Sequence, residues 1–220
     1  MVVHESRKES DSGHTKGEKM ARKIPEVLTA TEQEALLKQP NPRYLTGQRN
    51  RTMLRLMLDT GLRLAEVTSL RWKDIDLLSG KVMVRQGKGS KDRTLWTREE
   101  NIAALAAWRE RQARECDGKP EIVFSTAEGK RLDPSYVRKM VKRYARKAGI
   151  EKRISPHTLR HTFATDLYRE TTNLRITQKA LGHANIATTQ IYTHIVDEEL
   201  EGALKSFRRP ATVPPESDRA

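Results

Sequence analysis

The stretch that decides the fold is residues 155–192, SPHTLRHTFATDLYRETTNLRITQKALGHANIATTQIY. Pro156 favours the first turn of a helix, where its missing N–H group costs no hydrogen bond. An apolar residue then recurs every four positions, at Leu159, Phe163 and Leu167, which predicts one buried helical face. A second helix is expected over 174–181 and should end at Gly182, since glycine readily takes the left-handed conformation that follows many helices.

Four polar residues of this stretch are placed beside the predicted buried faces. His157 and Arg160 are three residues apart and therefore share one side of the first helix. His183 follows the glycine that should end the second helix. Tyr192 lies next to a third apolar pair, Ile191 and Ile195. Packing can hold all four side chains in fixed positions, which a catalytic site requires.

Each of the four residues also has an ordinary structural interpretation, as a surface, capping or packing residue. The pair His157 and His161 has the spacing of two zinc ligands on a helix. However, Thr158 stands where the metalloprotease motif needs glutamate, and no third ligand is evident. We therefore predict no metal site.

Taken together, the residues resemble the tyrosine recombinase (phage integrase) family. The sequence has His-x-x-Arg, then Leu-Gly-His with its histidine 23 residues past the arginine, then tyrosine nine residues further on. Residues 60–66, TGLRLAE, match the first arginine box of the family, and residues 87–93, GKGSKDR, match its lysine hairpin. The resemblance covers about residues 24–204. Several boxes in the right order are far more specific than any one alone.

The charge of the chain indicates a polyanionic partner. The 220 residues include 42 Lys and Arg against 29 Asp and Glu, a net charge of +13. The first 23 residues contribute only +2, so the basic excess lies in the part that should fold. Nucleic acid fits better than a membrane, because neither a long apolar segment nor a signal peptide is present; the family resemblance implies double-stranded DNA. The single cysteine, Cys116, excludes an intramolecular disulfide and fits a reducing compartment.

Hydrophobic patterning predicts one mainly helical α+β domain with a small antiparallel sheet, as in the family. The polar residues 1–23 and the Pro-rich tail 208–220 are expected to be disordered. The domain should span 24–207, with a final amphipathic helix over 196–207 whose stripe is Val196, Leu200, Ala203, Leu204 and Phe207. Earlier helices are expected after Thr29, from about 48 to 60, over 63–70, from a cap at Thr97 to about 115, and from a cap at Asp133 followed by Pro134 to about 148. Strands are expected over 74–78, 81–86 and 92–96, with a further short strand at 122–124.

The resemblance also implies a role for each matched residue. Arg63 and Arg160 would bind the oxygens of a DNA phosphate, since a guanidinium stays charged and grips an oxyanion in a planar fork. Glu66 would hold Arg63 in place, although a simple surface ion pair is the alternative. His157 and His183 would hydrogen-bond the phosphate in the transition state, and His157 is also a candidate to accept the nucleophile's proton.

Tyr192 would be the nucleophile, and the resemblance implies a 3′-phosphotyrosyl bond, a free 5′-hydroxyl, and no need for ATP, metal or other cofactor. Lys88 would protonate the leaving oxygen, with Lys91 as the competing candidate. The remaining basic residues of the predicted hairpin, Lys81, Arg85, Lys91 and Arg93, are expected to contact the DNA backbone or to form a solvated face.

Most members of the family carry a helical core-binding domain before the catalytic one, for which residues 1–23 are too few and too polar. We therefore expect either a catalytic fragment or a small single-domain recombinase. The leading interpretation is a site-specific recombinase, encoded by a phage or mobile element and acting at the nucleoid in the cytoplasm of a prokaryotic cell. The alternatives are a type IB topoisomerase-like enzyme and a non-catalytic DNA-binding regulator. In the family the last helix docks on a neighbouring protomer to form a tetramer; docking on its own domain is the alternative.

Overall fold

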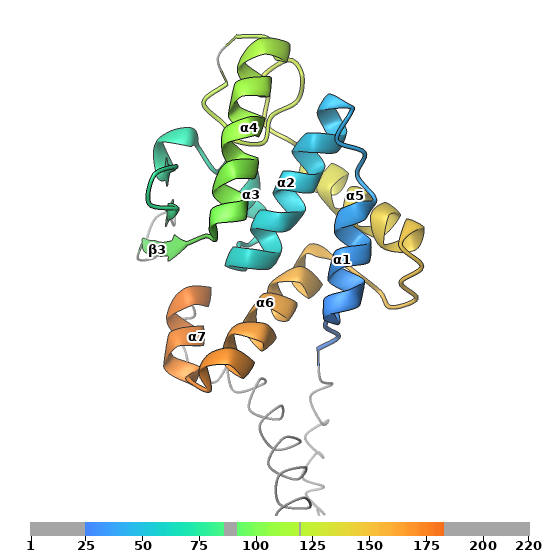
Figure 1. The fold of residues 1–220 in the computed structure, drawn as a ribbon, viewed down its shortest axis with the longest axis vertical. Coiled ribbons are helices and arrows are strands. Elements are labelled where there is room, and N and C mark those ends of the chain that lie inside the picture. The colour runs from blue at the N-terminus through green and yellow to red at the C-terminus, as the bar shows by residue number, and fades with distance from the viewer. Residues whose placement is uncertain (1–24, 86–91, 119, 183–220) are drawn as a thin grey trace, which may run out of the picture.

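The computed structural model describes residues 25–85, 92–118 and 120–182, and in this part helices predominate (Figure 1). The helices are α1 (Ala30–Lys38), α2 (Leu45–Thr60), α3 (Leu64–Ser69), α4 (Glu99–Glu115), α5 (Pro134–Lys147), α6 (Pro156–Thr171) and α7 (Leu174–Leu181). A short 3-10 turn, Trp72–Asp74, leads into the strands β1 (Ile75–Asp76), β2 (Lys81–Val84) and β3 (Arg93–Trp96). The strands form one antiparallel sheet in the order β1-β2-β3. The prediction of a mainly helical α+β domain is confirmed.

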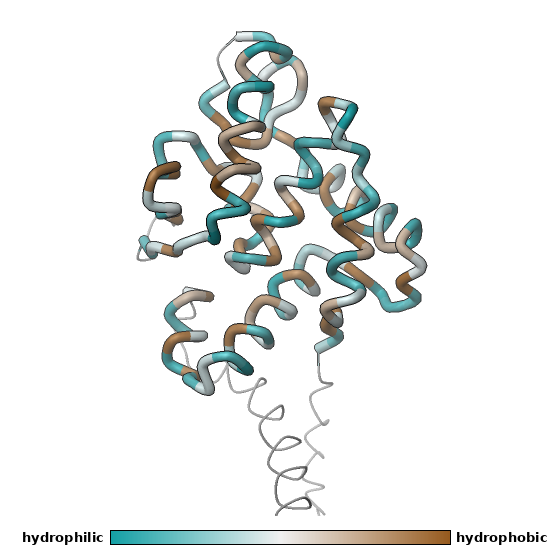
Figure 2. Tube along the Cα trace, viewed as in Figure 1, coloured by the Kyte–Doolittle hydropathy of each residue, from teal (hydrophilic) through white to brown (hydrophobic). Residues whose placement is uncertain are grey.

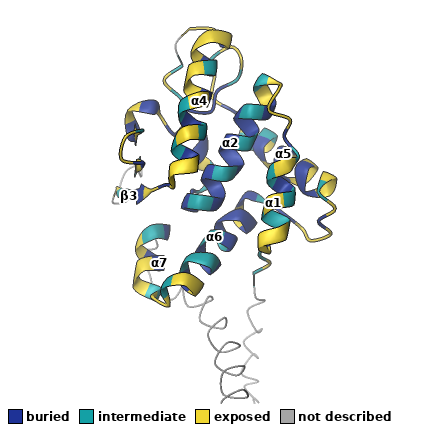
Figure 3. Ribbon diagram, in the orientation of Figure 1, coloured by how far each residue is buried: buried dark blue, intermediate teal, exposed yellow. Residues whose placement is uncertain are grey.

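Helix α2 is the centre of the fold. It packs against α4, α6 and α1, and Met53, Leu54, Leu56 and Met57 are fully buried. A helix that buries residues on most of its sides must lie inside the domain, and Figure 3 shows α2 mainly as buried ribbon surrounded by more exposed elements. Along the outer helices, hydrophobic and hydrophilic residues alternate (Figure 2), as expected for helices with one buried face.

Side-chain caps fix the starts of several helices where the sequence predicts them. Thr29 and Glu32 form a capping box at α1, and Asp133 accepts hydrogen bonds from the first turn of α5. Ser155 caps α6, and Pro156 is its first residue, as predicted. Each cap satisfies backbone N–H groups that have no partner within the helix.

Three helix starts differ from the prediction, and α2 begins at Leu45 rather than at about 48. Helix α4 begins at Glu99 rather than after a Thr97 cap, because the Thr97 hydroxyl donates to Asp59 and accepts a hydrogen bond from the Asn101 amide. Arg63 lies just before α3 in an extended conformation rather than within the helix. This conformation turns its backbone N–H towards Glu66, which accepts it.

The strands are shorter than predicted, although their order and pairing are regular. In the ladder of β2 and β3, Lys81 is paired with Trp96 and Val84 with Arg93. Residues 86–91, which include the predicted end of the second strand, lie outside the described part. The strand expected at 122–124 consists of a single bridge between Ile122 and Arg71.

The corner between α2 and α3 depends on a glycine. Gly61 has a φ of 60°, and a Cβ atom there would lie 2.3 Å from Cδ1 of Phe163 on α6. The left-handed conformation and the close approach both favour glycine. The corner therefore packs tightly on α6, which brings Arg63, two residues past Gly61, to the side of the fold that holds Arg160.

Replacing Gly61 with alanine should lower the free energy of unfolding by about 2–4 kcal/mol, because backbone strain and overpacking against Phe163 add. Gly149→Ala is the matched control: its φ is 71°, but no atom lies within 4 Å of the added Cβ. This variant should lose only about 1–2 kcal/mol. Urea unfolding followed by circular dichroism measures both. Equal losses would show that contact with Phe163 does not constrain the corner.

Candidate active site

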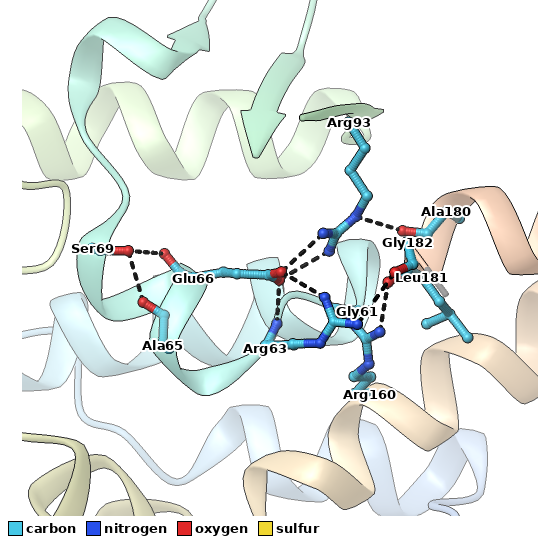
Figure 4. Close-up of polar contacts among 10 residues, drawn as sticks. All are labelled: Gly61, Arg63, Ala65, Glu66, Ser69, Arg93, Arg160, Ala180, Leu181 and Gly182. Carbon is cyan, nitrogen blue, oxygen red and sulfur yellow. Dashed lines mark hydrogen bonds and ion pairs between the residues drawn. The ribbon is translucent and has the colours of Figure 1, made fainter. Parts of the chain in front are cut away.

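Three arginines bind the three successive backbone carbonyls at the end of α7 (Figure 4). Arg93 Nε donates to Ala180 O at 2.9 Å, Arg160 Nη2 to Leu181 O at 2.6 Å, and Arg63 Nη2 to Gly182 O at 3.4 Å. The last carbonyls of a helix have no partner within it and carry the negative end of the helix dipole, so cations are favourable there. The arginines come from three distant parts of the chain, and α7 gathers them at one point.

The Glu66 carboxylate links two of these arginines. Its Oε1 accepts from Nη1 of Arg63 at 2.9 Å and from Nη1 of Arg93 at 2.8 Å. Its Oε2 accepts from the Arg63 backbone N–H at 2.7 Å and from Nη2 of Arg93 at 2.9 Å. Each carboxylate oxygen therefore accepts two hydrogen bonds. The sequence-based expectation that Glu66 contacts Arg63 agrees with this geometry.

These contacts keep Glu66 ionised. Burial of the carboxylate opposes ionisation, but hydrogen bonds from the Arg93 guanidinium and the Arg63 backbone N–H outweigh it, and the pKa of Glu66 is lowered to about 2. The charge of Arg93 and the side chain of Arg63 act in the same direction. A carboxylate with this pKa is charged at any physiological pH.

Arg63 and Arg160 differ in their access to solvent. Arg160 is 6% exposed, and its Nη1 also donates to Gly61 O at 2.6 Å, so it joins the α2–α3 corner to the end of α7. The Arg63 side chain is 37% exposed, and its bond to Gly182 is the longest of the three. Arg63 is thus held by hydrogen bonds to Glu66, while its guanidinium stays within reach of a ligand.

Two histidines of α6 lie near Arg160 in sequence. His157 is exposed, and His161 is partly buried one turn later. The pKa of His161 is lowered, first by burial and then by the positive charges of His157 and Arg160. In residues 25–85, 92–118 and 120–182, no three His, Cys, Asp or Glu side chains are grouped so that they could hold a metal ion.

The basic residues of the hairpin do not share one environment. Lys81 on β2 and Arg85 directly after it are exposed, and Arg85 Nε contacts Asp74 Oδ1 at 2.6 Å with 58% of its side chain exposed. The Arg93 side chain, in contrast, is 8% exposed. Its guanidinium lies against Glu66 and α7 rather than on the solvated face that the sequence suggested, because the first residue of β3 points towards α3.

The structure thus brings Arg63, Glu66 and Arg160 together at the end of α7 and adds Arg93. Residues 86–91 and 183–220 lie outside the described part, and with them the candidates Lys88, Lys91, His183 and Tyr192 and the predicted helix 196–207. The sequence did not predict the position of Arg93, because its partners Glu66 and Ala180 lie far from the hairpin motif in sequence. Gly182 is the last described residue before His183, so the end of α7 leads directly to that candidate.

Glu66→Gln should reduce stability at neutral pH but much less in acid. The pKa of Glu66 is lower in the folded chain than the ordinary value of 4.5. Its stabilisation is therefore fully present above about pH 4.5 and is lost as the pH falls towards 2, which amounts to roughly 3 kcal/mol. Urea unfolding from pH 7 to pH 2.5 should show the two proteins converging in acid. Parallel curves would contradict the ionised cluster.

Comparison with known proteins establishes the family. Residues 26–199 match the model of the phage integrase family, and the chain belongs to that family. It is 38% identical over 184 residues to the tyrosine recombinase XerD of Pseudomonas putida, covering 83% of this chain and 61% of that protein. It is 42% identical over 177 residues to XerC of Xanthomonas axonopodis pv. citri, covering 80% and 56%. The chain thus spans about three fifths of the length of these relatives.

Solved structures agree with this assignment. The XerA recombinase superposes with a TM-score of 0.73 at 34% identity, over 85% of this chain and 66% of that one. The XerH site-specific recombinase, in a post-cleavage complex with its palindromic difH substrate, gives a TM-score of 0.73 at 31% identity, over 85% and 54%. The catalytic domain of bacteriophage HP1 integrase, at 24% identity and a TM-score of 0.59, shares the fold.

Proposed function

We propose that this chain is the catalytic part of a site-specific DNA recombinase, which cleaves and rejoins DNA through a 3′-phosphotyrosyl intermediate without metal or ATP. The observation that supports it is the gathering of Arg63 and Arg160 at the end of α7, one residue before His183, with His157 on the same helix as Arg160. Guanidinium groups held in this way can bind the non-bridging oxygens of a phosphodiester and stabilise the charge of its transition state.

In the proposed reaction, the Tyr192 hydroxyl oxygen attacks the scissile phosphorus. The bond between phosphorus and the 5′-oxygen breaks as the tyrosyl–phosphate bond forms, so the bond type is conserved and no external energy is needed. The phenol proton leaves to a base, for which His157 is the candidate, and Lys88 gives a proton to the 5′-oxygen. Attack by the 5′-hydroxyl of another strand reverses these steps and releases Tyr192.

The positions of the four described tyrosines support Tyr192 as the nucleophile, because none of the four lies where it could attack the phosphate. Tyr144 and Tyr168 are buried, and the Tyr136 hydroxyl accepts a hydrogen bond from Arg49 at 2.7 Å. Tyr44 is 68% exposed but precedes α2. The 16 residues of that helix separate it by about 24 Å from Gly61 at the other end. None of these four is placed to attack a phosphate bound at Arg63.

The two alternative functions are less well supported. The two relatives described above are named as tyrosine recombinases, and XerH is a recombinase seen with its DNA substrate. A non-catalytic DNA-binding regulator would not need an ionised Glu66 to hold an accessible arginine. A type IB topoisomerase-like enzyme would cleave and rejoin one DNA strand by the same chemistry. It would not need a surface for assembly with other copies.

Tyr192→Phe should abolish covalent attachment to DNA while leaving binding nearly unchanged, because it removes one hydroxyl and keeps the ring. The chain is incubated with DNA from its own genomic neighbourhood, and covalent complexes are separated under denaturing conditions and their junctions mapped. Tyr44→Phe is the matched control and should attach like wild type, with or without EDTA. A covalent complex formed by Tyr192→Phe would exclude Tyr192 as the nucleophile, and loss of attachment in EDTA would point to metal chemistry.

A groove beside the arginine cluster supports assembly of several copies on DNA. It has a volume of about 1080 Å³ and lies among α1, α6, α7, β3 and the end of α2. Its apolar lining consists of Leu28, Leu58, Leu95, Trp96, Phe163, Leu167 and Ile176. Trp96 and Ile176 are 65% and 45% exposed. We propose that the predicted amphipathic helix 196–207 of a second copy occupies this groove, and that four copies assemble in this way.

Ile176→Glu should reduce assembly on DNA about as much as truncation before Val196, because a charge in the groove opposes docking of an apolar stripe. Both changes should impair strand exchange more than cleavage of one strand. Leu78→Glu is the control, since Leu78 is 97% exposed and does not line the groove. Sedimentation of the protein–DNA complexes measures assembly. Complexes of wild-type size with Ile176→Glu would contradict docking in the groove.

The proposed substrate also bears on where the protein acts. None of the described helices is long and apolar enough to cross a membrane. The relatives come from bacteria, and a DNA substrate together with a net charge of +13 supports action at the nucleoid, within the cytoplasm. Direction of recombination and target sequence would follow from the mapped junctions.

A further inference from the structure

Arg93 has a part in this site that its place in the lysine hairpin does not suggest. Three donors of its guanidinium are used within the protein: Nη1 and Nη2 on the two oxygens of Glu66, at 2.8 and 2.9 Å, and Nε on Ala180 O, at 2.9 Å. Its side chain is 8% exposed. A guanidinium held by a fork on a buried carboxylate is fixed in direction, and it is not exposed to solvent as Lys81 and Arg85 are.

The charges of the cluster show what Arg93 changes. Glu66 carries one negative charge and contacts two guanidinium groups, those of Arg63 and Arg93. With both arginines present the group has a net charge of +1. Without Arg93, the carboxylate would pair with Arg63 alone, and the net charge would be zero. Arg93 therefore keeps the net charge of the group around Arg63 positive, and the Arg63 side chain is the more exposed of the two.

The geometry of the cluster adds a second effect. Arg93 joins β3 to Glu66 of α3 and to Ala180 of α7 in a single side chain (Figure 4). Arg63 is held by the same Glu66 and touches the same end of α7 at Gly182. Loss of Arg93 would release both the carboxylate and the helix end against which the Arg63 side chain is aligned.

We propose that Arg93 is a positioning residue for phosphate binding: by holding Glu66 and the end of α7, it keeps the Arg63 guanidinium aligned towards the scissile phosphate and keeps the net charge of the cluster positive. This inference rests on the proposed function. It places the effect of Arg93 on the non-bridging oxygens of the phosphate, not on the leaving 5′-oxygen that Lys88 is proposed to protonate.

Modified DNA separates these two effects. Three nicked duplexes are built on a junction sequence mapped with the wild-type chain: one unmodified, one with a neutral methylphosphonate at the scissile position, and one with sulfur as the 5′-bridging atom. A neutral phosphate depends less on a cation, and a thiolate leaves without a proton. Arg93→Ala should attach to unmodified DNA about 10²-fold more slowly than wild type, the usual cost of a small misplacement.

The defect should shrink at least tenfold on the methylphosphonate duplex and persist on the bridging-sulfur duplex. Lys88→Ala serves as the opposite reference and should be rescued by sulfur. Arg71→Ala, which removes an exposed arginine paired with Glu121, should behave like wild type on all three. Arg93→Lys keeps a charge but not the fork and should fall between wild type and Arg93→Ala.

A double variant tests whether Arg93 acts through Glu66. Residues that act through each other are not additive, so Arg93→Ala combined with Glu66→Gln should be no slower than the slower single variant. Additive losses, rescue of Arg93→Ala by sulfur, or an equal defect on all three duplexes would each overturn the inference and leave the proposed function intact. A wild-type chain that attaches to no DNA would contradict the proposed function, and the inference with it.

Discussion

The end of helix α7 is the point on which the site depends. Its last three carbonyls, at Ala180, Leu181 and Gly182, each accept a hydrogen bond from a different arginine. Three guanidinium groups would repel one another if nothing balanced them. The negative end of the helix dipole and the ionised Glu66 supply that balance, so one short helix orders residues from α3, β3 and α6.

The three arginines at the end of α7 differ in how firmly they are held. Arg93 and Arg160 are almost fully buried, whereas Arg63 is partly open to solvent. Burial makes the first two costly to disturb, because a charge left without its partners inside a protein is strongly unfavourable. The protein thus holds two arginines rigidly and leaves the Arg63 guanidinium able to exchange its long contact with Gly182 for a ligand oxygen.

Much of this fold could be predicted from local signals. Asp133 with Pro134, Pro156, and Gly182 mark helix ends by chemistry that operates within a few residues, and all three positions were correct. The site residues Arg63 and Arg160 could be selected from a motif. The fork of Arg93 on Glu66 could not, because it joins residues 27 positions apart through tertiary packing. The same holds for Thr97, whose local sequence suggests a cap but whose hydroxyl is taken by Asp59.

The ordered position of Gly182 also limits how far from it the residues that follow in the chain can lie. Covalent geometry keeps the Cα atom of His183 about 3.8 Å from that of Gly182, the residue whose carbonyl accepts a hydrogen bond from Arg63. Tyr192 lies ten residues beyond Gly182, a tether that can extend to about 35 Å. That reach is longer than the distance across one phosphate-binding site. The described fold therefore orders the arginines that we propose to bind the phosphate, while chain length alone would allow Tyr192, the proposed nucleophile, to reach its own site or that of a neighbouring copy.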